Sequence, residues 1–102
     1  MFKMTAIYKV PSDVNAFADW FAAHTELVKK VPLTKEIRVT KITGGPRGPS
    51  DLHLITDLLF ASKEDFKTAM SSPENMACGK DAFTNYKDIV SVHFAEEETI
   101  KV

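Results

Sequence analysis

Cysteine is almost absent from this sequence of 102 residues, because Cys78 is the only one. A single cysteine excludes an internal disulfide and is compatible with a reducing compartment such as the cytosol. No apolar run approaches the roughly 18 residues of a membrane span, and the N-terminus lacks the pattern of a signal peptide. We therefore expect a cytoplasmic protein that does not associate with a membrane.

The sequence also lacks an excess of charge of one sign. Its 13 Lys and Arg residues nearly balance its 14 Asp and Glu residues, and the formal net charge is −1. Without a basic surface to hold phosphates, binding to nucleic acid is not expected. The single charge run, residues 96–98, is interpreted as the solvated end of a strand rather than a binding tail.

Glycine is scarce, and three of the four glycines lie in residues 44–51, the one stretch rich in Gly and Pro. This stretch lacks the Gly-Lys-Ser/Thr ending of a phosphate-binding loop, so it is interpreted as a hairpin turn. No motif for nucleotide or flavin is found, and no cofactor is expected. His53 and His93 lie on separate predicted strands without a second ligand at a short spacing, so no metal site is expected either.

The stretch around which the chain is organised runs from Tyr8 to His24. Residues 2–10 alternate as a strand, and Pro11-Ser12-Asp13 ends that strand and supplies an N-cap for a helix over residues 13–31. Apolar residues then recur at spacings of three and four, which gives the helix one apolar face. His24 falls on this face, so its titratable ring points inward, where it needs a partner or a ligand.

The remaining chain predicts strands at residues 35–43, 52–60 and 88–97. A helix begins after Ser62 and carries Phe66 and Met70 on its buried side, and a short helix restarts at Ser72-Pro73. Met76, Phe83 and Tyr86 are expected to anchor the segment that follows. The order β-α-β-β-α-β is typical of a single α+β domain of the ferredoxin-like type over residues 1–102, with both helical segments on one face of a four-stranded antiparallel sheet.

The second face of this sheet is expected to be amphipathic. Ile7, Ile55 and Leu59 are predicted to share it with polar residues, namely Lys3, Lys9, His53 and Asp57. Burying the aliphatic residues by self-association is favourable at about 25 cal/mol per Å². A monomer with a few exposed aliphatic residues is the alternative, and composition favours neither.

Three sequence features carry a resemblance to a known family. They are the pattern Tyr8-x-x-Pro11-x-Asp13-x-x-Ala16-Phe17, the pair Trp20-Phe21, and His24-x-x-Leu27 followed by Pro32-Leu33. With these features the sequence resembles the EthD family. This family is named for ethyl tert-butyl ether degradation and belongs to the dimeric α+β barrel superfamily. The resemblance implies a homodimer in which two sheets pack face to face. It also implies a cleft between each sheet and its own helices, with His24 pointing into the cleft.

Two features depart from the family pattern. Glu26-Leu27 stands where a Pro-Leu pair often follows the histidine, and Trp20 with Phe21 stands where the helix often carries a tyrosine. A phenolic hydroxyl could instead come from Tyr8 on the neighbouring strand. The superfamily includes monooxygenases without cofactors, cyclases, decarboxylases and haem proteins, and fold alone does not choose among them.

Two hypotheses of different classes follow. In the first, the protein is a cofactor-independent enzyme, of the oxygenase, cyclase or decarboxylase type, that acts on a small hydrophobic oxygen-bearing molecule. His24 and Tyr8 would be its catalytic residues, and Trp20, Phe21 and Phe60 would bind the ligand. In the second, it is a non-catalytic homodimeric binding or accessory protein, in which His24 orients a ligand or completes the core.

Overall fold

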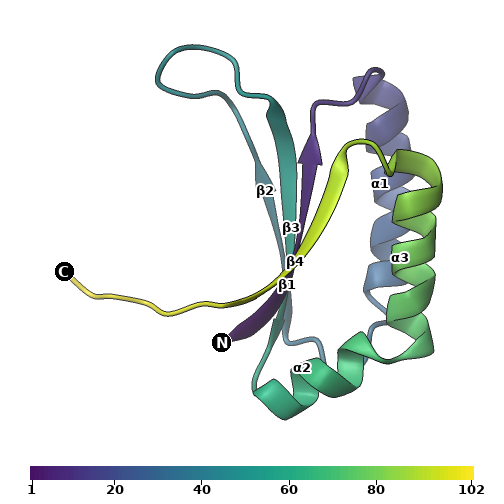
Figure 1. Ribbon diagram of the computed structural model, residues 1–102, viewed down its shortest axis with the longest axis vertical. Coiled ribbons are helices and arrows are strands. Elements are labelled where there is room, and N and C mark those ends of the chain that lie inside the picture. The colour runs from purple at the N-terminus through teal and green to yellow at the C-terminus, as the bar shows by residue number, and fades with distance from the viewer.

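Two strand–helix–strand units build the fold, and the computed structural model describes all of residues 1–102. The first unit contains β1 (Phe2–Lys9), α1 (Val14–Val28) and β2 (Glu36–Lys41). The second contains β3 (Leu52–Phe60), α2 (Lys63–Met70), α3 (Pro73–Tyr86) and β4 (Val90–Glu96). The strands form one antiparallel sheet in the order β2-β3-β1-β4 (Figure 1). The predicted ferredoxin-like α+β fold is therefore confirmed.

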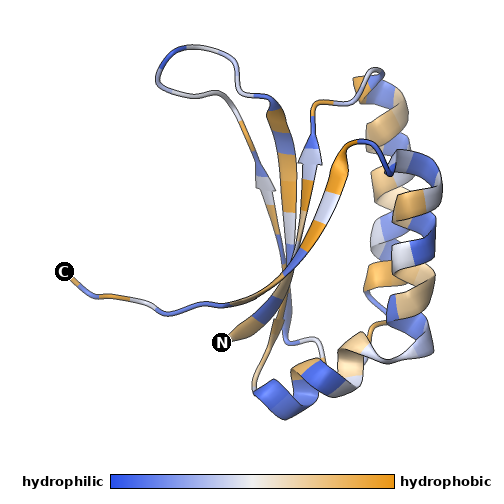
Figure 2. Cartoon of the chain, viewed as in Figure 1, coloured by the Kyte–Doolittle hydropathy of each residue, from blue (hydrophilic) through white to orange (hydrophobic).

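All three helices lie on the same side of the sheet (Figure 1). Helices α1 and α3 run next to each other over its face, and α2 lies near one end. Polar and apolar residues alternate along the strands (Figure 2), and the two central strands, β1 and β3, bury a row of side chains beneath the helices. In β1 this row contains Met4, Ala6 and Tyr8, which lie opposite Leu58, Thr56 and Leu54 of β3.

Side-chain caps determine where the helices begin. The oxygens of Asp13, Ser62 and Ser72 accept backbone N–H groups at the starts of α1, α2 and α3. Helix α1 ends at Val28 rather than at the predicted residue 31, because residues 29–30 form a turn. No helix of the fold combines the length and the apolar run that crossing a membrane would require.

Helix α3 differs most from the sequence-based expectation. It is 14 residues long, so the prediction of a short helix was wrong. Cys78 and Ala82 form its buried side, whereas Met76 and Phe83 are 67% and 46% exposed. The expectation that Met76 and Phe83 anchor this segment was therefore also wrong, because small residues face the sheet.

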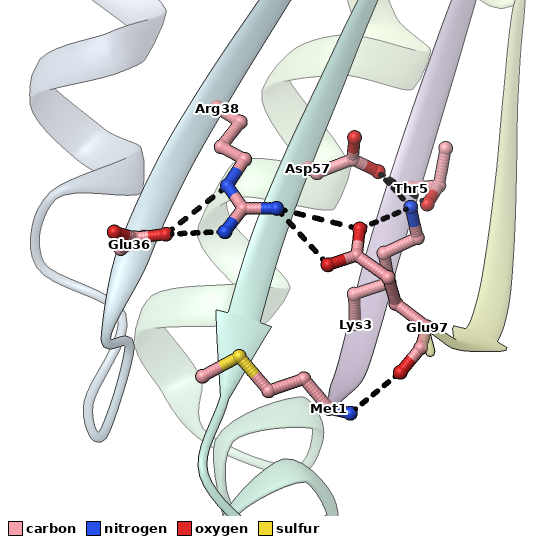
Figure 3. A network of polar contacts seen from close by, with 7 residues as sticks. All are labelled: Met1, Lys3, Thr5, Glu36, Arg38, Asp57 and Glu97. Carbon is pink, nitrogen blue, oxygen red and sulfur yellow. Dashed lines mark hydrogen bonds and ion pairs between the residues drawn. The ribbon is translucent and has the colours of Figure 1, made fainter. Parts of the chain in front are cut away.

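Charged side chains cross the face of the sheet that the helices leave open (Figure 3). Lys3 Nζ lies 3.5 Å from Asp57 Oδ1 and 3.4 Å from Glu97 Oε2. Arg38 binds Glu36 at 2.8 Å and Glu97 at 3.0 Å. These hydrogen bonds raise the pKa of Arg38 and lower that of Glu97. Glu97, in the run predicted to be a solvated strand end, is partly exposed and pairs with side chains of β1 and β2.

A bulge in β3 changes the orientation predicted for His53. Lys9 pairs with Leu52 and Tyr8 with Leu54, so His53 is an extra residue between the two pairs. Its ring lies edge-on to Phe17 of α1, with 5.4 Å between the ring centroids. The prediction that His53 lies on the open face was therefore wrong, because the bulge breaks the strict alternation of the strand.

Candidate active site

His24 lies on the inner side of α1 and is only 6% exposed. Phe17, seven residues earlier, and Val28, four residues later, are the other buried residues of this helix. This spacing places all three on one stripe of the helix, which packs toward the sheet. The prediction that the His24 ring points inward is confirmed by this burial.

Asp81 of α3 is the partner of His24. The distance from His24 Nδ1 to Asp81 Oδ2 is 2.8 Å. Since an ionised carboxylate only accepts hydrogen bonds, Nδ1 carries the proton and donates it. When the imidazole is neutral, this tautomer leaves Nε2 unprotonated, and the hydrogen bond to Asp81 is made at Nδ1 alone. The pair therefore presents a ring nitrogen that can accept a proton.

Aromatic contacts hold the imidazole in place. Trp20 lies one helical turn before His24, and the two rings stack with 4.5 Å between centroids and 19° between planes. Stacking on one side and the hydrogen bond to Asp81 at the edge together restrict rotation of the His24 ring. The indole face would also stabilise the positive charge that His24 gains when it accepts a proton.

A cavity of about 220 Å³ lies between the sheet and the helices, and His24 lines it. Thirteen of its 17 lining residues are hydrophobic. Small residues leave the space open, since Ala6 lies on the floor and Gly79 and Ala82 face it from α3. At the backbone of Gly79, an added Cβ would have no atom within 4 Å. The cavity is thus a product of side-chain size rather than of a gap between elements.

Tyr8 is on the floor of the same cavity and is 1% exposed. Burial, together with the nearby Asp81 carboxylate and Cys78, raises the pKa of Tyr8 well above its ordinary value. No hydrogen bond contributes to this shift, and the hydroxyl has no partner in the protein. Tyr8 therefore remains a neutral phenol that can donate a hydrogen bond into the cavity.

Thr56 is a second hydroxyl residue on the floor, and it is 5% exposed. Its Oγ1 is buried and has no hydrogen-bond partner. Cys78 also lines the cavity, and burial followed by the Asp81 charge raises its pKa to about 11. A thiol with this pKa stays protonated near neutral pH and is a poor nucleophile.

The structure brings together two of the five site residues predicted from sequence. His24 and Tyr8 line the cavity, whereas Trp20 supports His24 from behind and does not line it. Phe21 faces a separate, more open depression between α1 and β2, and Phe60 is fully buried in the core. The ligand-binding role of these three residues stays a prediction.

Sequence reasoning did not single out Asp81 and Thr56. Asp81 is 57 residues from His24, so no local spacing links the two. Thr56 did carry a signal, because it is the one polar residue in the row Leu54, Thr56, Leu58 and Phe60. The ring of His93 forms a hydrogen bond with Ser91, and no three His, Cys, Asp or Glu side chains form a group that could hold a metal.

Comparisons with known proteins identify close relatives of this chain. The model of the EthD domain matches residues 10–88. An uncharacterized 11.0 kDa protein of Rhodococcus erythropolis, encoded in the thcB-thcC intergenic region, is 28% identical over 101 residues, which is 98% of each chain. The crystal structure of an EthD family protein from Bacillus halodurans has a TM-score of 0.91 and 32% identity, and the match covers 96% of this chain and 99% of that one.

More distant structures share the fold alone. A dimeric protein with a ferredoxin-like fold from Bacteroides fragilis has a TM-score of 0.64 and 18% identity, covering 94% and 95% of the two chains. A hydroxynitrile lyase from Passiflora edulis has a TM-score of 0.68 and 16% identity, and the match covers 97% of this chain and 96% of that one. A cofactor-independent oxygenase from Streptomyces nogalater has a TM-score of 0.65 and 10% identity, and the match covers 99% of this chain and 94% of that one. This fold therefore carries more than one type of chemistry.

Proposed function

This chain belongs to the EthD domain family, and from that premise we propose that it is a cofactor-independent enzyme in which His24 moves a proton. The pair of His24 and Asp81 is the observation that carries this proposal. Asp81 fixes the ring orientation and tautomer, and Nε2 is left as the base beside an apolar cavity. A positioned acid–base group of this kind accelerates proton transfer by about 10²- to 10⁴-fold.

The size and lining of the cavity support one class of substrate. A dry cavity of about 150 Å³ in another protein is large enough to bind benzene. The cavity described above, about 220 Å³, therefore suits a molecule with one ring or a short branched chain. Its polar lining includes the hydroxyls of Tyr8 and Thr56, the imidazole of His24 and the amide of Asn75, which supports a substrate with an oxygen-bearing group.

We further propose that the protein acts as a homodimer. Ile7 and Ile55 lie opposite each other at the centre of the open sheet face, and both are only half-buried. Packing two copies of this face together would remove these aliphatic side chains from water. The dimeric neighbour with the same fold supports this arrangement.

A non-catalytic binding protein is the second candidate. The observation that favours it is that the bond between His24 and Asp81 joins α1 to α3. This bond would stabilise the packing of the helices whether or not a proton is ever transferred. In that case the cavity would bind its ligand without changing it.

Exchange of hydrogen for deuterium in small ketones tests the enzymatic proposal without knowledge of the natural substrate. Acetophenone is incubated with the protein in D2O, and loss of the signal from its α-hydrogens is followed by NMR. Cleavage of mandelonitrile, followed by release of benzaldehyde, provides a second probe. We expect the wild type to accelerate at least one reaction, His24→Ala to abolish the acceleration, and Asp81→Asn to reduce it roughly tenfold or more.

The matched control is Glu74→Gln, which removes an exposed acidic residue from the same helix as Asp81. We expect this variant to react like the wild type. If neither probe reacts faster with the wild type than with folded His24→Ala, while acetophenone still binds to both, the protein is a binding protein and the enzymatic proposal fails.

A further inference from the structure

The hydroxyl oxygen of Thr56, on the cavity floor, is fully buried and has no hydrogen-bond partner in the protein. Thr56 is on β3, a central strand of the sheet, and lies between Ala6 of β1 and Val39 of β2. Its neighbours in this row are apolar, and none can accept or donate a hydrogen bond. The methyl-sized side chain of Ala6 leaves room above the row for a ligand.

A hydroxyl buried without a partner is unfavourable relative to an apolar group of the same shape. Valine has nearly the shape of threonine and carries no hydroxyl, so it would fit this row without that penalty. The position of Thr56 thus lowers the stability of the empty fold. Such a group is expected where a ligand supplies the missing partner.

Tyr8 supplies a second hydroxyl close to Thr56. Tyr8 pairs with Leu54 and Ala6 pairs with Thr56, so Tyr8 and Thr56 are diagonal neighbours on the same face of the sheet. Diagonal neighbours of this kind lie within reach of one small molecule. Both hydroxyls line the cavity that His24 also lines. The cavity floor therefore offers two hydrogen-bond donors, and its helical side offers one base.

We propose that Thr56 and Tyr8 form an oxygen-binding pair that selects small carbonyl compounds for this cavity. Both hydroxyls donate to the carbonyl oxygen, and the adjacent carbon then lies toward His24. This inference rests on the proposed function, because it assigns the substrate class of the same site. It makes Thr56 a specificity-determining residue rather than a part of the core.

The corresponding reaction is proton abstraction from the carbon next to the carbonyl group. Nε2 of His24 takes the proton, the C–H electron pair becomes a C=C bond, and the carbonyl π electrons move to oxygen. The oxygen then carries a negative charge, to which the two hydroxyls donate stronger hydrogen bonds than to the neutral carbonyl. Return of the proton from His24 to carbon or oxygen completes the step, and no other reactant is needed.

Binding of two molecules of similar shape tests the role of Thr56 separately from turnover. Acetophenone carries a carbonyl oxygen, whereas ethylbenzene replaces it with hydrogens. Each is titrated into the wild type and Thr56→Val, and the dissociation constants are obtained from the NMR signals of the methyl groups. We expect Thr56→Val to weaken acetophenone binding about five- to tenfold, the effect of one hydrogen bond, and to leave ethylbenzene binding unchanged or tighter.

Thr56→Ser is the matched variant, because it keeps the hydroxyl and loses only the methyl group. We expect it to retain the preference for acetophenone over ethylbenzene, and we expect Thr56→Val to unfold at a higher temperature than the wild type. Equal losses for both ligands in Thr56→Val, or no loss for acetophenone, would overturn the inference, since Thr56 would then act only by packing or through solvent.

The outcomes also separate this inference from the proposed function. If Thr56→Val keeps its acetophenone affinity while His24→Ala loses deuterium exchange, the oxygen-binding pair is wrong and the enzymatic proposal stands. If the wild type prefers acetophenone through Thr56 but exchanges no deuterium, the pair is supported and the protein binds carbonyl compounds without turnover.

Discussion

At the scale of single residues, two weak acids near Asp81 stay protonated because of where they are buried. The pKa of Cys78 rises from 9.0 to about 11, and that of Tyr8 rises further above its ordinary 10.0. In each case burial is the larger cause and the negative charge of Asp81 adds to it. A single carboxylate thus orients His24 and adds to the burial that keeps a hydroxyl and a thiol neutral in the same cavity.

This protonation predicts that the fold loses stability in alkaline solution. Between the pKa of the unfolded chain and the higher pKa of the folded state, the folded protein holds more protons than the unfolded chain. The free energy of unfolding therefore falls as pH rises from about 9 for Cys78 and from about 10 for Tyr8. Urea unfolding at several pH values between 7 and 10.5 measures this decline.

The variants Cys78→Ala and Tyr8→Phe assign the decline to these two groups. Each variant removes one titrating group, so its free energy of unfolding should fall less steeply with pH than that of the wild type. The difference should begin above about pH 9 for Cys78→Ala and above about pH 10 for Tyr8→Phe. Comparison with the wild type cancels the contribution of lysines, which titrate in the same range. Identical slopes for the wild type and both variants would contradict the explanation.

At the scale of elements, α3 combines a well-formed start with a weak point at its centre. Ser72 caps the helix and Pro73 occupies its first turn, both of which favour the helix. Gly79 lies in the middle, where glycine is less stable than alanine by about 1 kcal/mol. Since Gly79 lines the cavity, the helix gives up stability at the point where a side chain would reduce the space for a ligand.

Replacement of Gly79 by alanine tests this balance. A new Cβ meets no atom within 4 Å, so Gly79→Ala should stabilise the fold by about 0.5–1 kcal/mol. The added methyl group enters the cavity, so acetophenone should bind more weakly. Thermal unfolding and NMR titration measure the two effects. Ala77→Gly, at an exposed position of the same helix, should instead lower stability and leave binding unchanged.

A gain in stability without any loss of affinity would show that Gly79 does not limit the cavity. A loss of stability would show that the helix near Gly79 does not tolerate a Cβ. Either result would contradict the role given to this residue.

The elements also show how far the sequence alone predicts the structure. Local signals located the starts of the helices, since Asp13 and Ser62 cap α1 and α2 and Pro73 occupies the first turn of α3 as expected. The spacing around His24 placed its ring inside. The bulge at His53 escaped prediction because it depends on pairing with β1, which alternation within one strand does not reveal. Asp81 escaped prediction because its partner lies on a different helix.

At the scale of the whole molecule, the open sheet face controls the oligomeric state in our proposal. Ile7→Glu places a charge at the centre of this face, where a partner would bury it without a counter-charge. We expect this variant to be monomeric, whereas the wild type should have the mass of a dimer. Light scattering coupled to size-exclusion chromatography measures both masses.

Ala23→Glu is the matched control, because it places the same charge on the exposed side of α1, away from the sheet. This variant should remain dimeric. The ion pairs of Lys3 and Arg38 are partly exposed, so high salt should weaken them and have little effect on a contact formed by aliphatic residues. A monomeric wild type at micromolar concentrations would contradict the face-to-face dimer.

The separation of His24 and Asp81 along the chain has a consequence for folding kinetics. The two residues belong to different strand–helix–strand units and are 57 positions apart, so their contact closes a long loop. Contacts between such distant segments form only after chain entropy has been lost over the whole intervening stretch. The site is consequently assembled only when both halves have docked on the shared sheet, so a folding species that has formed only one of the two units has no complete cavity.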